Sequence, residues 1–265
     1  MIRALLFCPF LLLFVFRAQG EGLSTCLELP GGFVIGGFSG GKWLSSEQAG
    51  KTVVPGHPYS VYKLFGLGGR VTGGKAKANQ DVCPDVWEQE VQPANEEKAI
   101  AVSASWNPMP RKAKLSDPKQ EVYVKAARDF LISKGISEPT VKITQILRID
   151  LDGDGEEEVL LTATNYLKDD GTVPSSAAAG NYSFVLLRSV VNGKVQTKLV
   201  EGDFYSKANE NAAPNRYEVR GLLDLNGDGR LEIIVGSSYY EGGGASIWQF
   251  GAGKLKRVLE YGCGA

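Results

Sequence analysis

The sequence predicts a mainly β (α+β) fold in which antiparallel β-hairpins carry acidic loops and one α-helix packs against a sheet. Short runs rich in β-branched and aromatic residues recur along the chain, separated by clusters of Gly, Pro, Asn and Asp, as in strands joined by turns. One acidic pattern occurs twice, each time directly before such a run. One segment, at about residues 117-134, has the start, spacing and stop signals of a helix. These features favour a partial propeller-like or sandwich arrangement.

Residues 1–20 have the pattern of a signal peptide. Arg3 precedes an apolar run from Ala4 to Phe16, and small residues occupy the −3 and −1 positions before a cleavage point after Gly20. The run of 13 apolar residues is shorter than the about 20 that span a bilayer. We therefore expect cleavage after Gly20, no stable membrane span afterwards, and a secreted, periplasmic or other extracellular location.

Residues 21–115 are predicted to form a β-rich N-terminal segment of about four strands. The clearest strand signals are the runs Phe33–Ile35, Tyr59–Phe65 and Ala99–Ser105. The stretch from Trp106 onward contains two prolines and is predicted to connect this segment to the rest of the chain.

The helix is the first element predicted in the remaining segment, residues 116–265. Asp117 is expected to cap it, with Pro118 at the first helical position and Gln120 completing a capping box. Gly135 is expected to end it. One face collects the apolar side chains, which predicts packing of the helix against a sheet: Tyr123, Val124, Ala127, Phe130 and Leu131.

Eight further runs after the helix favour strands. They are Val141–Ile149, Glu158–Thr164, Tyr182–Val191, Lys194–Glu201, Tyr217–Leu223, Glu232–Ser237, Ser246–Phe250 and Leu255–Tyr261. The duplicated acidic pattern lies between the first and second of these runs and again between the fifth and sixth. Each acidic loop is therefore expected to join two strands.

The acidic pattern reads D-x-[DN]-G-D-G-x-x-E, and its copies start at Asp150 and at Asp224, 74 residues apart (224 − 150). Oxygen-bearing side chains at alternate positions, followed by a glycine that tolerates positive φ, make several oxygens converge, as a hard divalent cation requires. We expect two Ca²⁺ sites. Side-chain oxygens would come from Asp150, Asp152, Asp154 and Glu158 in one loop and from Asp224, Asn226, Asp228 and Glu232 in the other, and backbone carbonyls from Glu156 and Arg230.

The pattern has two other interpretations. An EF-hand begins in the same way but needs a Glu at position 12, where this chain has Leu161 and Val235. The pattern also suits Asp- and Gly-rich turns that bind no metal, although two copies with the same acidic frame favour metal binding.

The segment Leu222–Gly236 resembles the calcium loop of FG-GAP/VCBS-type repeats, which are β-hairpin units of integrin-like propellers and of many secreted proteins, and Ile149–Val159 resembles a second copy. The resemblance implies a β scaffold stiffened by metal and leaves the activity open, because such proteins include adhesion domains, lectins and accessory modules of enzymes. The spacing of 74 residues departs from the roughly 40 to 50 of propeller blades.

Three cysteines remain after removal of the signal peptide, namely Cys26, Cys83 and Cys263. In an oxidising compartment they permit one disulfide and leave one thiol. The pairing Cys26–Cys263 would join the two ends of the chain, but the sequence does not choose among the three pairings.

Loss of the two basic residues of the signal peptide takes the 29 basic side chains of the chain to 27, against 30 acidic ones. Without a basic stripe, nucleic-acid binding is disfavoured. The sequence therefore predicts an exported Ca²⁺-binding β-scaffold with a structural or ligand-binding/adhesion role, whose partner is an extracellular protein or a glycan.

Two alternatives stay open. One is a secreted hydrolase stabilised by Ca²⁺, with Ser39 in a G-x-S-x-G pattern as an esterase nucleophile, or with Asp85, Glu88 and Glu90 as glycosidase carboxylates. The other is a carbohydrate-binding module, for which the aromatic residues offer a stacking platform: Trp87, Trp106, Tyr239, Tyr240 and Trp248. The loop after Tyr239 is the strongest candidate for a binding segment, since it follows the second acidic hairpin.

Overall fold

The computed structural model describes residues 22–264, so the predicted signal peptide lies outside the described residues. The mainly β prediction is confirmed, because 53% of the chain is in strands and 8% is helical. The strands form sheets of seven, five and four members, and their pairings are antiparallel. In this part of the chain, neither helix is long and apolar enough to cross a membrane.

The N-terminal sheet has the order β1-β7-β4-β5-β6-β2-β3, and β1 also pairs with β2, so six of its strands close into a barrel. Its apolar interior includes Leu29, Tyr59 and Val61. The elements are β1 (Ser24–Leu29), β2 (Phe33–Ser39), β3 (Lys42–Leu44), α1 (Ser46–Thr52), β4 (His57–Lys63), β5 (Gly66–Asn79), β6 (Cys83–Gln92) and β7 (Ala99–Ser103).

The helix α1 is an element that the sequence analysis missed. Ser45 caps it in a capping box: the Ser45 hydroxyl accepts from the Gln48 N–H at 3.3 Å, and the Gln48 side chain accepts from the Ser45 N–H at 3.0 Å. The signal Ser45-x-x-Gln48 is therefore present in the sequence. The helix is only 7 residues long, too short for a visible apolar repeat.

The other two sheets are consecutive antiparallel meanders. One has the order β12-β11-β10-β9-β8 and the other β13-β14-β15-β16. The strands β9 to β16 confirm the eight predicted runs, most of which extend by a few residues in the structure, whereas the short strand β8 was not predicted. The strands are β8 (Lys114–Leu115), β9 (Ile143–Ile149), β10 (Glu158–Thr164), β11 (Asn181–Val191), β12 (Lys194–Tyr205), β13 (Arg216–Leu223), β14 (Glu232–Tyr239), β15 (Gly242–Gly251) and β16 (Lys254–Gly264).

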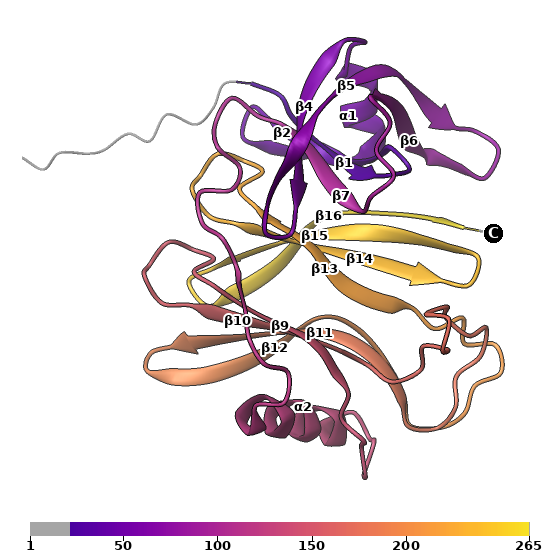
Figure 1. Ribbon diagram of the computed structural model, residues 1–265, viewed down its shortest axis with the longest axis vertical. Helices are drawn as coiled ribbons and strands as arrows, with labels where there is room; N and C mark the ends of the chain where they lie inside the picture. The colour runs from indigo at the N-terminus through magenta and orange to yellow at the C-terminus, as the bar shows by residue number, and fades with distance from the viewer. Residues whose placement is uncertain (1–21, 265) are drawn as a thin grey trace, which may run out of the picture.

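These parts stack face to face in a row, as Figure 1 shows: the barrel, the β13–β16 sheet, the β8–β12 sheet and α2 (Glu121–Ser133). An apolar cluster fills each junction. Ile100 and Ile247 meet between the barrel and the β13–β16 sheet, Leu160 and Ile233 between the two meanders, and Leu131 of α2 packs onto the β8–β12 sheet. The row of layers is a sandwich-like arrangement.

The helix α2 confirms the predicted element but not its start. It begins at Glu121, because Asp117 makes a local turn in which its carboxylate accepts from the Lys119 N–H at 2.9 Å. Gln120 is the N-cap residue and makes no side-chain capping bond, so the predicted capping box is wrong. The helix end is as predicted, since Gly135 takes a φ of +86°.

The part of the chain that the structure describes contains one disulfide and one thiol, as predicted for the chain without its signal peptide. Cys83 of β6 and Cys263 of β16 are bonded, with 5.6 Å between their Cα atoms, whereas Cys26 is a buried free thiol. The bridge therefore ties the barrel to the β13–β16 sheet.

Candidate metal centre

The two acidic loops occupy equivalent places in the two meanders. The first acidic loop, residues 150–158, joins β9 to β10, and the second acidic loop, residues 224–232, joins β13 to β14. Both glycines of each loop take a positive φ, between 75° and 95°, a backbone conformation that disfavours other residues. The repeated sequence thus gives a repeated backbone.

In the first acidic loop, Asp150 organises the turn. Its Oδ1 accepts from the Gly153 N–H at 2.6 Å, and its Oδ2 accepts from the Gly155 N–H at 3.2 Å. Asp154 Oδ1 accepts from the Glu156 N–H at 2.8 Å. The buried Glu158 reaches back across the loop, with Oε2 accepting from the Leu151 N–H at 2.9 Å. The loop is folded by its own carboxylates.

Three of these acidic residues converge. One carboxylate oxygen each of Asp150, Asp152 and Glu158 lie within 4.8 Å of one another. Asp152 Oδ1 is a buried oxygen with no hydrogen-bond partner among the described residues. A buried oxygen without a donor is costly unless something else satisfies it. These residues fit a cation, and Asp154 is the neighbouring carboxylate.

The second acidic loop repeats these bonds with two differences. Asp224 accepts from the Gly227 and Gly229 N–H groups at 2.7 and 2.9 Å, and Glu232 Oε2 accepts from the Leu225 N–H at 2.7 Å. Asp228 Oδ1 accepts from the Arg230 N–H at 2.8 Å.

The first difference is Asn226, whose side-chain oxygen accepts from the Asp228 N–H at 3.0 Å, in the place of Asp152. The second is Gln249, whose amide donates to Glu232 Oε1 at 3.1 Å. Among the described residues, no cluster of three acidic groups like that of the first loop is found in the second.

Burial raises the pKa of the two inner glutamates. It lifts the pKa of Glu158 to about 7, with help from the charges of Asp152 and Asp154 and opposed by the Leu151 N–H. It lifts the pKa of Glu232 to about 8, opposed first by the N–H of Leu225. Carboxylates that resist losing their protons in water-poor surroundings are stabilised by a bound cation.

The two loops touch each other. The Leu231 N–H donates to the Leu151 carbonyl at 2.8 Å. The pKa of Asp152 is raised, first by burial and then by the charges of Asp154 and Asp150, and the positive charge of Arg230 opposes this rise. Arg230 was expected to offer only its backbone carbonyl, but its side chain also acts on the first loop.

Arg111 of the proline-containing connector bridges the two loops, which sequence reasoning missed. Its Nε donates to the Asp150 carbonyl at 2.6 Å, and its Nη2 donates to the carbonyls of Leu151 at 3.2 Å and Gly229 at 2.9 Å. A guanidinium presents such a fan of donors in fixed geometry. The sequence around Arg111 gives no sign of this role, because Asp150, whose carbonyl Arg111 binds, lies 39 positions later in the chain.

The same connector also holds the second loop. The indole N–H of Trp106 donates to the Asp224 carbonyl at 2.9 Å, and the Asp224 N–H donates to the Pro108 carbonyl at 2.7 Å. A Cβ at Gly227 would lie 3.3 Å from the Trp106 ring, so the glycine lets the indole lie against the loop. Trp106 is thus part of the loop support.

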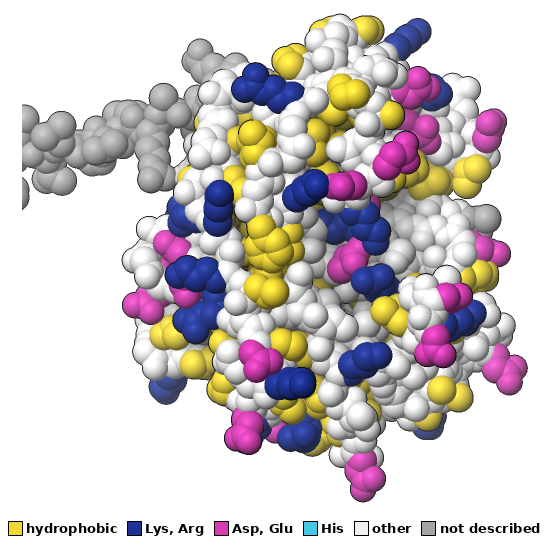
Figure 2. All heavy atoms as spheres, in the orientation of Figure 1, with side chains coloured by type: hydrophobic (Ala, Val, Ile, Leu, Met, Phe, Trp, Pro, Cys, Tyr) yellow, Lys and Arg dark blue, Asp and Glu magenta, His cyan; other side chains and the backbone are white. Residues whose placement is uncertain are grey.

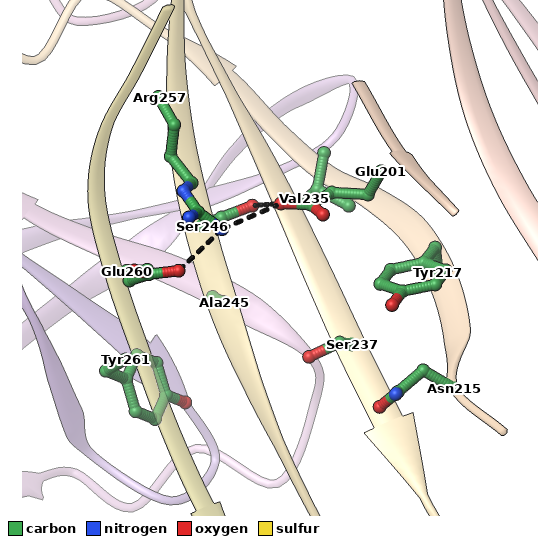
Figure 3. Close-up of a pocket in the computed structure, with 10 residues that line it drawn as sticks. All are labelled: Glu201, Asn215, Tyr217, Val235, Ser237, Ala245, Ser246, Arg257, Glu260 and Tyr261. Carbon is green, nitrogen blue, oxygen red and sulfur yellow. Dashed lines mark hydrogen bonds and ion pairs between the residues drawn. The ribbon is translucent and has the colours of Figure 1, made fainter. Parts of the chain in front are cut away.

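A small polar cavity of about 180 Å³ is lined by residues of β12 to β16 and by none of the acidic-loop residues (Figure 3). Glu201 Oε1 accepts from the Ser246 hydroxyl at 2.8 Å, and Arg257 pairs with Glu260 at 2.6 Å. The residues that line it include no histidine, and the only histidine of the chain, His57, lies in β4. The side chains of Glu201, Ser246, Arg257 and Glu260 therefore pair with one another across the cavity.

The hydrolase patterns lie in ordinary strand and turn positions. Ser39 ends β2, and Gly40 and Gly41 form the turn to β3 with φ of 55° and 76°. Glu88 accepts from the Asn79 amide at 2.6 Å, and Glu90 pairs with Lys77 at 3.6 Å. No nucleophile elbow with a following helix is built around Ser39, since α1 begins only after β3.

No protein-family model, curated protein or solved structure matches this chain.

Proposed function

We propose that this protein is an exported Ca²⁺-binding β-scaffold with a structural or ligand-binding role. The observation that carries the proposal is the convergence of Asp150, Asp152 and Glu158 within 4.8 Å, around the unpartnered Asp152 Oδ1. The repetition of the same hydrogen bonds around Asp224 and Glu232 supports a second, weaker site.

The donor set favours Ca²⁺ over other cations. Carboxylates, an amide oxygen and backbone carbonyls are hard oxygen ligands, and the loops contain neither His nor Cys, which zinc prefers. Mg²⁺ demands octahedral geometry and gives up its water reluctantly, so a loop of many converging oxygens suits it less well.

When bound, Ca²⁺ would supply charge neutralisation for buried carboxylates. The position of the loops favours a structural role for the ion. Each loop joins two strands of a meander, and Arg111 and Trp106 tie both loops to the connector from the barrel. The loops lie at the junction of the layers, so ordering them would stiffen the whole stack. With no histidine near the acidic groups, an ion-holding role is favoured over catalysis.

Calorimetric titration of metal-stripped protein with Ca²⁺ tests this proposal. We expect two equivalents to bind below about 1 mM, within the range of extracellular sites. Asp152→Asn should weaken the tighter site at least tenfold, while Asp169→Asn, an exposed control in another loop, should leave both sites unchanged. Absence of binding in the unmodified protein would overturn the proposal.

A further inference from the structure

A groove between the barrel and the β13–β16 sheet has a volume of about 680 Å³. Figure 2 shows a hollow in this region, near the C-terminal end marked in Figure 1. It is lined from both sides: by residues of β1, β2 and the β5–β6 turn, and by residues of β13 to β16 including the strand start Gly242–Gly244. The Cys83–Cys263 disulfide ties these two walls together, and Cys263 is itself a lining residue. The size and the fixed walls are those of a small-molecule site.

Aromatic and apolar side chains from both walls line part of the groove. The rings of Phe33 and Tyr261 stack with 5.7 Å between centroids and 29° between planes. Leu29, Pro30 and Val82 add to the apolar lining on the barrel wall, and Val82 is 56% exposed. Stacked rings with an accessible neighbour favour a further planar ring as ligand.

A cluster of charged side chains lies at the same groove. Arg220 pairs with Glu28 through Nη1 and with Glu218 through Nε at 3.2 Å. Glu218 also pairs with Lys98 at 2.8 Å and with Arg216 at 3.0 Å, and Glu28 also accepts from the Tyr261 hydroxyl. Three basic groups therefore share two carboxylates in this cluster, and Glu241, which also lines the groove, adds a further negative charge.

Among the described residues, the two glutamates of this cluster leave one nitrogen of Arg220, Nη2, without an acceptor. Both oxygens of each glutamate already accept a hydrogen bond or ion pair. Within residues 22–264, the recorded partners of Arg220 use Nε and Nη1, and no acceptor is recorded for Nη2. The Arg220 side chain is only 12% exposed, so little water competes for these donors. An anionic acceptor on Nη2 would complete the hydrogen bonding of the guanidinium.

Two glycines keep this geometry open. A Cβ at Gly236 would lie 2.0 Å from Arg220 Nε, and one at Gly31 would lie 2.4 Å from the Phe33 ring. Each position therefore needs glycine so that the guanidinium and the ring can lie where they do.

We propose that this groove binds a planar aromatic carboxylate, with the ring against Phe33 and Tyr261 and the carboxylate on Arg220 Nη2 and Lys98. A carboxylate can accept a charge-assisted hydrogen bond from the remaining donors of Arg220 Nη2. The groove contains none of the acidic-loop ligands, so the inference goes beyond the Ca²⁺ scaffold and does not depend on it.

The test compares 2-naphthylacetate with its neutral isostere 2-naphthylacetamide by calorimetry on the disulfide-bonded protein, with Ca²⁺ and with a chelator. We expect the acid to bind about tenfold more tightly than the amide, as a charge-assisted contact allows. Arg220→Lys keeps the charge beside Glu28 but removes the free Nη2, and should bring the acid-to-amide ratio close to one. Arg70→Lys, at an exposed barrel position, is the matched control.

A second variant keeps the test independent of Arg220. Phe33→Leu removes the flat ring and should weaken acid and amide by the same factor, about fivefold, whereas Phe65→Leu, on an exposed turn, should change neither. Melting curves confirm that each variant is folded. Equal affinities of acid and amide for the unmodified protein, or no binding of either at about 1 mM, would overturn the proposal whatever the outcome for Ca²⁺.

Discussion

Single residues set the difference between the two acidic loops. Asp152 and Asn226 occupy the same place, but the Asn226 oxygen accepts from the Asp228 N–H, whereas the buried Asp152 Oδ1 has no partner among the described residues. The Gln249 amide also occupies one oxygen of Glu232, whereas within residues 22–264 no side-chain amide donates to Glu158. The first loop therefore offers a cation more negative charge and more carboxylate oxygens that do not already accept a hydrogen bond.

This difference predicts an order of Ca²⁺ affinity. Asp152→Ala should remove more of the Ca²⁺-dependent gain in melting temperature than Asn226→Ala, because it deletes a charged ligand and not a neutral one. Saturation at a hundredfold excess over Kd is worth about 2.7 kcal/mol per site, or roughly 5–10 °C for a chain of this size. Equal losses in the two variants, measured by calorimetric melting, would defeat the ranking.

The buried glutamates predict a pH dependence in metal-stripped protein. Their folded-state pKa values, about 7 for Glu158 and about 8 for Glu232, lie above the usual 4.5. The folded state then holds protons that the unfolded state releases, so this contribution to stability is complete below about pH 4.5 and is lost as the pH rises through 7 and 8. The melting temperature should fall from pH 6 to pH 9.

Glu232→Gln should flatten the upper part of that fall, because a neutral amide does not titrate. Added Ca²⁺ should raise the melting temperature more at pH 8 than at pH 5.5. A Glu232→Gln protein whose melting temperature falls as steeply as that of the unmodified protein would show that this carboxylate does not drive the effect.

At the scale of elements, the acidic loops were predictable and their support was not. The glycines and carboxylates act on backbone groups at most seven positions away, so their roles follow from the local pattern. Arg111 and Trp106 act across 39 to 118 positions, and only the folded chain brings them to the loops.

Strands with regular alternation were likewise predictable, and β10 matches its predicted bounds, Glu158–Thr164. The strands β5 and β6 were missed. Gly66–Asn79 contains many glycines and bends through bulges in its pairing with β6, which removes the alternation. The exposed face of β6 carries Asp85 and Glu90, so its sequence resembles a solvated loop.

Arg111→Ala should loosen both loops at once. It deletes donors to three backbone carbonyls of Asp150, Leu151 and Gly229, which predicts a loss of about 2–4 kcal/mol in the free energy of unfolding. Both Ca²⁺ sites should weaken, whereas Arg128→Ala, at an exposed position of α2, should have little effect. Urea unfolding and Ca²⁺ titration measure the two consequences, and weakening of one site alone would argue against a shared support.

At the scale of the whole molecule, four layers are joined by apolar clusters and by one covalent bridge. The disulfide links positions 180 residues apart and joins the first layer to the last strand, β16. The sequence predicted the number of bridges but not the pairing, because the approach of β6 to β16 depends on how the barrel sits on the β13–β16 sheet.

Replacing Cys83 and Cys263 by Ser should therefore lower the free energy of unfolding by about 2–5 kcal/mol, as expected for a long closed loop. Cys26→Ala, which leaves the bridge intact, is the control and should cost less. Urea denaturation of the three proteins gives the comparison. A double variant as stable as the unmodified protein would show that the apolar clusters alone hold the barrel in place.

The central claim is that the acidic loops hold Ca²⁺. The structure of a crystal grown with Ca²⁺ tests this claim most directly. We expect anomalous density inside the first acidic loop, 2.3–2.6 Å from oxygens of Asp150, Asp152 and Glu158, and weaker density in the second. Density in neither loop at about 10 mM Ca²⁺, far above the affinity range of such sites, would contradict the claim.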